Sequence, residues 1–313
     1  MAQPPWSGRQ LKVGESQRRP WAKRANRDAL LAWTILTPLL LYYTVFAIIP
    51  VAANLALSFF QWNGITEWVW IGLQNYLHLL TDPYYLQVYA NTAFFAVVSV
   101  LIQIPLGLLV AVLVNQKLSG MAVYRSLWYV PVVTSAAIMS QVVVIFMAPY
   151  GGVLNSILTG LGLTPVIWLV NVEALRAVIL GFTVWKGVGA IMVLYLAALQ
   201  GIPNELYEAA SIDGANSVQK FRFITVPMLR NMTTFVVITG IIGGFQIFEP
   251  VLLISNGGPY NQTNVVLNQI YNDAFKNMDF GRATASSTLL ALVLLIGSVI
   301  TTRMSRQADG SSS

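Results

Sequence analysis

Residues 29–53 read ALLAWTILTPLLLYYTVFAIIPVAA, and this stretch decides the class of fold. None of its side chains is charged at neutral pH, and only threonine and tyrosine contribute hydroxyl groups. A helix of this length crosses the roughly 30 Å of hydrocarbon in a bilayer, and membrane helices tolerate prolines such as Pro38 and Pro50. A cleaved signal peptide would have a shorter apolar core and a small-residue cleavage site. The stretch therefore predicts a retained transmembrane helix.

The composition of the whole chain points the same way. Of its 313 residues, 56% are hydrophobic and 10% are charged, with a mean hydropathy of +0.64, whereas a soluble domain carries roughly 25% charged residues. The chain has no cysteine and one histidine, His78, which excludes disulfides, cysteine-ligated metals and Ser/His catalysis. We expect a membrane protein without a catalytic residue, metal site or cofactor of its own.

Six apolar stretches are long enough to span a bilayer. They are residues 29–53, 89–114, 127–147, 174–199, 232–254 and 283–302. The sequence thus predicts an all-α, polytopic membrane protein with six transmembrane helices. We expect a basic cytoplasmic tail at 1–28, a transmembrane domain at 29–303 and a disordered cytoplasmic tail at 304–313.

The basic residues orient these spans. If the N-terminus is cytoplasmic, the outer side receives only Arg176, Lys276 and Arg282, and Lys186 lies within the fourth span. The inner side then holds Arg9, Lys12, Arg18, Arg19, Lys23, Arg24, Arg27, Lys117, Arg125, Lys220, Arg222, Arg230, Arg303 and Arg306. This asymmetry follows the positive-inside rule, so both termini are assigned to the cytoplasm. A net charge of +6 distributed in this way indicates contact with anionic lipid rather than with nucleic acid.

The predicted outer loops are rich in aromatic and turn residues. Residues 61–83 include Trp62, Trp68 and Trp70, a density that favours an aromatic belt at the membrane interface; a recognition surface is the alternative. Residues 255–281 open with Asn-Gly-Gly-Pro at 256–259, which is a turn signal.

The most informative stretch is the loop between the fourth and fifth spans. Residues 202–216 read IPNELYEAASIDGAN. Pro203 is favoured at the first position of a helix, and Gly214 is a stop signal. Between them the sequence predicts a short exposed helix whose small-residue face contains Leu206, Ala209, Ala210 and Asp213. A second helical run is predicted from about Asn216 to Thr225, ending at Pro227.

An amphipathic helix lying on the bilayer is the alternative for the first of these two helices. Such helices favour Lys, Arg and bulky apolar residues, whereas this one carries Glu205, Glu208 and several alanines. Docking to another protein is the better interpretation.

The same loop carries a family signature. Glu208-Ala209-Ala210, Gly214, Ile224 and Pro227 fall at the spacing E-A-A, three residues, G, nine residues, I, one residue, L-P, with Val226 in place of leucine. With these residues the chain resembles the permease subunits of binding-protein-dependent ABC importers. LQGIP at 199–203, GLQNY at 72–76, NGGP at 256–259 and FG at 280–281 are similar to the carbohydrate-uptake branch, in particular to the maltose- and glycerol-3-phosphate-type first permease.

The resemblance implies a set of partners and a plasma (inner) membrane location. The chain has no G-x-x-x-x-G-K-[ST] run, so ATP and Mg are expected to be bound by a partner ATPase. The implied partners are a second homologous permease, two copies of a cytoplasmic ATPase and an extracytoplasmic solute-binding protein, together with membrane lipid. The residues it assigns to ATPase coupling are Glu205, Leu206, Glu208, Ala209, Ala210, Asp213, Gly214, Ala215 and Pro227.

The fourth and fifth spans contain the candidate pathway residues. Gly240, Gly243, Gly244 and Ile247 lie at i, i+3, i+4 and i+7 and so share one helical face. Such a face suits either tight helix packing or a substrate. The resemblance favours the substrate. The pathway set that it implies is Lys186, Gly187, Ala190, Gly240, Gly243, Gly244, Gln246, Ile247 and Glu249.

Three questions stay open at this point. Lys186 either pairs with Glu249 inside the membrane or binds an anionic or hydroxyl-rich cargo, because intramembrane charges are costly and usually have a partner. The cargo is a sugar or sugar-like solute, with glycerol phosphate or a polyol-type compatible solute as the alternative. A secondary transporter is the alternative from a different class, although no paired broken helices or internal repeats are evident.

Overall fold

The structure, a computed structural model, describes residues 19–116 and 119–310. Most of the predicted basic tail (residues 1–18), Lys117 and the last three residues of the predicted C-terminal tail lie outside the described residues. The chain divides into two compact units, Met1–Asn54 and Leu55–Ser313. Each unit is described here by itself.

The first unit is helical throughout its described part. Helix α1 (Arg19–Tyr43) leads into the π-helical turn η2 (Thr44–Ile48) and then into α2 (Ile49–Leu57), which crosses the unit boundary. The helix therefore begins ten residues before the predicted span. The most apolar 18-residue window of Leu31–Leu57 has a mean hydropathy of 2.0 and no buried side chain. Such an apolar helix is compatible with lipid, because all its backbone bonds lie within the segment.

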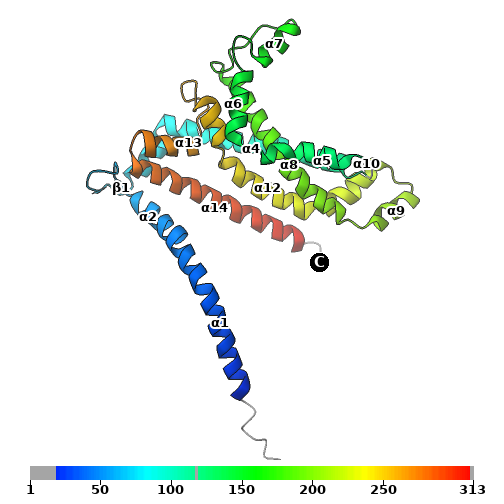
Figure 1. The fold of residues 1–313 in the computed structure, drawn as a ribbon, viewed down its shortest axis with the longest axis horizontal. Helices are drawn as coiled ribbons and strands as arrows, with labels where there is room; N and C mark the ends of the chain where they lie inside the picture. The colour runs from blue at the N-terminus through cyan, green and yellow to red at the C-terminus, as the bar shows by residue number, and fades with distance from the viewer. Residues whose placement is uncertain (1–18, 117–118, 311–313) are drawn as a thin grey trace, which may run out of the picture. The chain divides into compact units, whose positions relative to one another are not determined.

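The second unit is a helical bundle with α4 (Pro83–Val114) at its centre (Figure 1). Helix α4 packs against α8 (Val172–Gln200) and α12 (Arg230–Phe245), and α12 packs in turn against α14 (Phe280–Gly310). The approach of α4 to α8 is close, because a Cβ atom at Gly107 would lie 2.5 Å from the side chain of Ile191. Small residues at such crossings let two membrane helices come together.

Several shorter elements lie at the two ends of this bundle (Figure 1). At one end, α8 and α12 are joined by α9 (Asn204–Ile212), α10 (Ser217–Lys220), η3 (Phe221–Thr225) and α11 (Val226–Met228). At the other end lie β1 (Phe60–Gln61) and α13 (Val266–Tyr271). The remaining elements are β2 (Val69–Trp70), α3 (Gln74–Thr81), α5 (Met121–Val133), α6 (Ala136–Phe146), α7 (Val153–Gly160), η4 (Val251–Ser255) and η5 (Asn272–Lys276).

The buried core follows the long helices. One cluster joins the C-terminal halves of α4 and α8 and includes Ala111, Val188 and Tyr195. A second cluster lies nearer the other end and includes Phe95 and Ile179. Much of the remaining apolar surface of the helices is exposed, which agrees with a bundle that is surrounded by lipid or by other subunits.

Within the described residues, four helices are long and apolar enough to cross a membrane, and the number rises to as many as six if each of two bent pairs is one span. Two of the predicted spans differ in the structure. The 127–147 stretch is broken into α5 and α6, which bend by 94°, and the helix predicted to end at Ile254 ends at Phe245. Proline at 131 and the glycines and proline at 243–250 explain these breaks, because both residue types weaken helices.

Three smaller differences concern the ends and loops. The predicted aromatic loop contains an antiparallel pairing of β1 with β2, in which Phe60 faces Trp70, so the fold is mostly rather than entirely helical. Helix α14 continues to Gly310 and covers most of the segment for which a disordered tail is expected. The second helical run of the coupling loop passes through Pro227 and ends at Met228.

Candidate functional site

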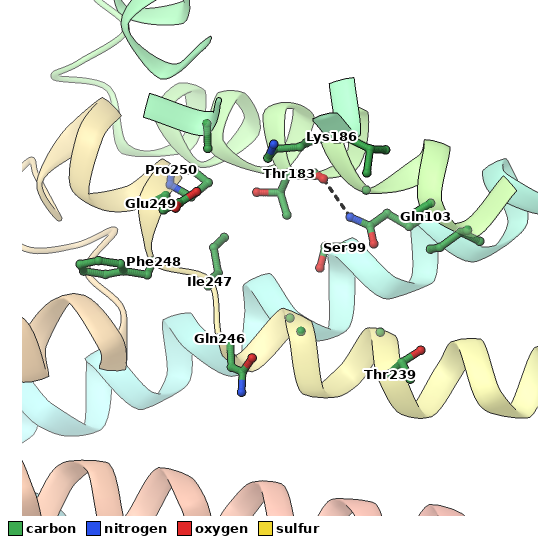
Figure 2. A pocket seen from close by; sticks show the side chains of 18 of the residues that line it. Ser99, Gln103, Thr183, Lys186, Thr239, Gln246, Ile247, Phe248, Glu249 and Pro250 are labelled. Carbon is green, nitrogen blue, oxygen red and sulfur yellow. Dashed lines mark hydrogen bonds between the residues drawn. The ribbon is translucent and has the colours of Figure 1, made fainter. Parts of the chain in front are cut away.

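A cavity of about 730 Å³ lies among α4, α8, α12 and the break between α5 and α6. Its size falls within the range of small-molecule sites, roughly 300–1,000 Å³. All nine residues predicted for the pathway line it: Lys186, Gly187, Ala190, Gly240, Gly243, Gly244, Gln246, Ile247 and Glu249. Figure 2 shows Glu249 and Pro250 on one side of this space, with Ser99 and Gln103 on the other. The structure thus brings together residues that are far apart in the chain, and their contact with a substrate stays a prediction.

Lys186 has partners other than those that the sequence suggested. Its ammonium group donates to the carbonyl oxygen of Thr134 at 2.8 Å and to that of Pro131 at 3.3 Å. Both carbonyls lie at the C-terminal end of α5, where the helix has stopped and leaves acceptors without helical partners. A cation at this end of a helix also meets the negative pole of the helix dipole.

The pairing of Lys186 with Glu249, one of the two alternatives for this lysine, is not present among the described residues. No salt bridge joins the two side chains in the part of the chain that the structure describes, and Glu249 is exposed. The physical reason is the α5 break, which provides Lys186 with carbonyl acceptors. Hydrogen bonds to a charged group contribute about 1.5–3 kcal/mol each, comparable with the roughly 2.5–3.5 kcal/mol cost of a lysine at the membrane centre.

The glycines of the cavity differ in what surrounds them. A Cβ atom at Gly187 would lie 2.5 Å from the Gln103 amide, and one at Gly244 would lie 2.8 Å from the Cα atom of Ala96. At Gly240 the nearest atom, in Val100, is 3.3 Å away, whereas nothing lies within 4 Å at Gly243. Tight packing therefore explains Gly187 and Gly244, and only Gly243 faces open space.

The single helical face predicted for 240–247 is only partly correct. Helix α12 ends at Phe245, so Ile247 lies in the link that follows and does not continue the helical spacing. It still reaches the cavity, because the chain turns there and buries its side chain to 6% exposure.

The structure adds polar groups from α4 to this site. The Gln103 amide donates to the carbonyl oxygen of Thr183 at 2.9 Å, which ties α4 to α8 (Figure 2). Ser99, one turn earlier, lines the same cavity. Gln141, in the third predicted span, is exposed. Polar side chains at helical spacing in an apolar span were the available signal for Ser99 and Gln103.

Val132 and Ala136, which flank the α5–α6 break, also line the cavity. They are apolar residues in an apolar stretch, so nothing in their own chemistry distinguished them. Only the bend places them at the site.

The predicted coupling helix is present as α9, with Pro203 just before its first residue rather than in it. Its exposed side chains include Glu205, Glu208, Ala209 and Asp213, while Ala210 and Ala215 are half-buried. Leu206 is 42% exposed and Ile212 is 87% exposed. Exposed apolar side chains beside acidic ones form a surface that suits a protein partner.

Hydrogen bonds fix the end of α9. Gly214 has a φ of +81°, and the next amide, of Ala215, donates to the Ala210 carbonyl oxygen at 2.8 Å while the Gly214 amide donates to Ser211 at 3.1 Å. This pair of bonds is a Schellman motif, which favours glycine at its left-handed position. The predicted stop at Gly214 is therefore confirmed. Asn216 and Gln219 then form a capping box that starts α10.

Two hydrogen bonds tie α9 to the segment that follows it, and the packing of Tyr207 holds α9 against the bundle. The Tyr207 hydroxyl lies 2.9 Å from the hydroxyl of buried Thr225, and Tyr207 packs against the core of α4 and α8. Lys220 donates to the Ser211 hydroxyl at 2.6 Å. The acidic and alanine-rich face of α9 is thus presented from a fixed support.

A buried polar network that the sequence did not reveal lies at the opposite end. Asp273 is 1% exposed and accepts hydrogen bonds from Tyr85 at 3.0 Å, from Gln269 at 2.8 Å and from Asn277 at 3.1 Å. Burial raises the pKa of this carboxyl, and these hydrogen bonds and the charge of Arg282 offset part of the rise. Because the network joins residues about 190 positions apart, no local pattern predicted it. Within the described ranges, no three His, Cys, Asp or Glu side chains gather as a metal site.

Residues 103–310 match the family model described as "binding-protein-dependent transport system inner membrane component". The chain belongs to this family. The matched region contains α8 and α12, which line the cavity, and the whole coupling segment. The resemblance that the EAA signature carries is therefore confirmed.

Relatives and solved structures match most of the length of this chain. The chain is 32% identical over 275 residues to the probable ABC transporter permease protein YurN of Bacillus subtilis. The aligned region covers 86% of this chain and 94% of YurN. It is 33% identical to the lactose transport system permease protein LacF of Rhizobium radiobacter, with 84% and 90% covered.

Among solved structures, a chain of a bacterial ABC transporter that imports the acidic polysaccharide alginate superposes with a TM-score of 0.82 at 26% identity, covering 92% of this chain and 98% of that one. A second structure of the alginate transporter is a complex with an alginate pentasaccharide-bound periplasmic protein. The fold is that of an ABC transporter permease.

Proposed function

We propose that the protein is a sugar permease subunit of an ATP-driven importer and that it forms half of the translocation pathway. The observation that carries the proposal is the cavity, which collects all nine predicted pathway residues in the middle of the helical bundle. The relatives that transport lactose and alginate support a sugar as the cargo. A site between bundle helices is a common place for a small-molecule ligand.

The proposed topology has six spans, with α5 and α6 counted together as the third and α12 as the fifth, and both termini in the cytoplasm. The distribution of basic residues supports it, since the loops at the α9 end carry Lys220, Arg222 and Arg230. In this orientation α9 faces the cytoplasm, and the Asp273 network lies on the outer side. The protein then resides in the plasma (inner) membrane as a multi-pass subunit.

The proposed ATP-dependent step runs through α9. An exposed helix with acidic and apolar side chains on a fixed support suits docking to an ATPase subunit, which would bind ATP and Mg. Movement of that subunit would pull on α9, and the Tyr207–Thr225 contact would pass the pull to α12 through η3 and α11. Two ATPase copies and a second permease complete the proposed assembly.

An extracytoplasmic solute-binding protein is proposed to deliver the sugar at the outer end. The alginate transporter solved with its periplasmic protein supports this partner. A neutral sugar is favoured over glycerol phosphate, because Lys186 already uses two of its three N–H donors on backbone carbonyls. Glycerol phosphate and polyol-type solutes remain the alternatives.

The test is reconstitution of the chain with its partner permease, ATPase and binding protein in proteoliposomes. We expect ATP hydrolysis and sugar uptake to rise when the sugar-loaded binding protein is added. The variants Glu208→Arg and Gly214→Pro should abolish ATPase association, and Glu67→Arg, an equal charge reversal on the exposed outer hairpin, should not.

Intact association of the Glu208→Arg and Gly214→Pro variants would refute the coupling role of α9. Uptake that persists without ATP and follows an ion gradient would instead establish a secondary transporter.

A further inference from the structure

The break between α5 and α6 forms part of the cavity wall, and one side chain from another helix holds it. Thr134 and Ser135 both have extended backbone conformations, so the helical bonding stops there. The carbonyl oxygens of Pro131 and Thr134 therefore lack the backbone N–H donors that a continuous helix would supply. Unsatisfied backbone groups are costly inside a membrane.

Lys186 supplies the missing donors. Its ammonium group bonds both carbonyl oxygens, at 3.3 Å and 2.8 Å, and the Thr134 hydroxyl adds a bond of 2.8 Å to the Pro131 carbonyl oxygen. No ion pair involving Lys186 is found among the described residues. The charge of Lys186 is therefore placed on the end of a broken helix rather than on a carboxylate.

A glycine near Lys186 in α8 lets this helix approach α5 closely. A Cβ atom at Gly189, three residues further on and so on the same helical face, would lie 2.2 Å from the backbone oxygen of Trp128 in α5. The two helices thus touch backbone to backbone one turn from the lysine. This close contact lets a side chain of α8 reach the end of α5.

We propose that Lys186 is a positioning residue that fixes the α5–α6 bend and thereby the shape of the cavity wall formed by Val132 and Ala136. Without Lys186 the Thr134 carbonyl oxygen loses its donor, whereas the Pro131 carbonyl oxygen keeps the bond from the Thr134 hydroxyl. The Thr134 carbonyl regains a backbone donor if the break straightens or shifts. Lys186 then acts on transport through the bend and not by contact with the cargo. The transport part of this inference rests on the proposed function, whereas the geometry of the bend can be measured independently.

The test uses a pair of spin labels across the bend. The chain has no native cysteine, so Val123→Cys in α5 and Ile145→Cys in α6, both exposed, can be labelled in the assembled complex, with the other subunits prepared without reactive cysteines. At 1.5 Å per residue and a bend of 94°, the helix axes at these positions lie about 22 Å apart, against about 33 Å in a straight helix.

We expect a narrow distance distribution for the otherwise wild-type chain and for Lys186→Arg, which keeps the charge and the donors. Lys186→Met should shift population toward longer distances, by up to about 10 Å, and should reduce sugar uptake. Lys276→Met, which removes an exposed lysine elsewhere, is the control and should change neither. If Lys186→Met does not assemble, Lys186→Gln, which is shorter and neutral, should broaden the distribution relative to Lys186→Arg.

A spin-label distance distribution that is unchanged in Lys186→Met or Lys186→Gln would overturn the proposal. If sugar uptake nevertheless falls in that variant, Lys186 acts by contact with the cargo instead. A changed distribution in a complex that never transports sugar would uphold the bend and refute the proposed function.

Discussion

Gly189→Ala offers the sharpest test of how closely α5 and α8 pack. The new methyl carbon would lie 2.2 Å from the Trp128 carbonyl oxygen and 2.9 Å from a Val132 methyl group. A backbone oxygen cannot rotate away, so α5 must withdraw by about 1.2 Å to restore ordinary contact near 3.4 Å.

Overpacking of this kind costs about 1–3 kcal/mol, and such a severe backbone contact belongs at the upper end of that range. Replacing a helical glycine by alanine returns about 1 kcal/mol. A net loss of about 2 kcal/mol of stability follows.

Gly243→Ala is the matched control, because it is the same substitution in a helix with nothing within 4 Å of the new atom. It should gain up to about 1 kcal/mol. The two variants should therefore differ by about 3 kcal/mol, or roughly 6–12 °C in the apparent melting temperature of the purified complex. A Gly189→Ala variant that melts at or above Gly243→Ala would refute the backbone contact.

Three further predictions concern other parts of the chain. Burial raises the pKa of Asp273 above its ordinary value, so ionisation of this carboxyl lowers the free energy of unfolding. The stability that the protonated carboxyl contributes is present below about pH 4. It is lost as the pH rises through the raised pKa. The melting temperature of the wild type relative to Asp273→Asn should therefore fall from pH 4 to neutral pH, and a constant difference would contradict the buried charge. Asn155→Ala removes hydrogen bonds to Pro149, Val166 and Trp168. At about 1 kcal/mol per bond, this loss should speed proteolysis of residues 150–170 by ten-fold or more. Thr159→Ala is the control, and equal cleavage rates in the two variants would count against the role of Asn155. Gly214→Ala should strain the end of α9 by about 1–2 kcal/mol and reduce binding-protein-stimulated ATP hydrolysis. Gly120→Ala, which places the same strain at a φ of +86° in open space, should leave this hydrolysis unchanged. An equal loss of hydrolysis in both variants would show that strain alone is responsible.

The local features of the coupling segment were predictable because their causes are local. Pro203, Gly214 and the spacing of Glu208-Ala209-Ala210 lie within a dozen residues, and helix caps depend on neighbours in the chain. The structure reproduces the helix and its stop with a shift of one residue at the start. The apolar spans were predictable for a similar reason, since their length follows from bilayer thickness.

The partners of Lys186 could not be predicted. A charged side chain in an apolar stretch indicated that Lys186 needs a partner, and Glu249 was the only carboxylate in the predicted spans. The actual acceptors are backbone carbonyls, which every residue possesses, and they become available only because α5 ends at Val133. Asp273 presents the same difficulty, because its donor Tyr85 is 188 residues away.

By itself the sequence determined that this chain is a helical membrane protein and that a short helix with an EAA signature lies between two of its apolar stretches. These properties depend on composition, periodicity and nearby residues, which a linear pattern contains. Only the tertiary structure decided that nine residues from two spans meet around one cavity and that Lys186 caps a broken helix. It also decided which glycine faces open space. Those outcomes depend on where one helix stops and how closely another approaches, and both are settled by packing across the bundle.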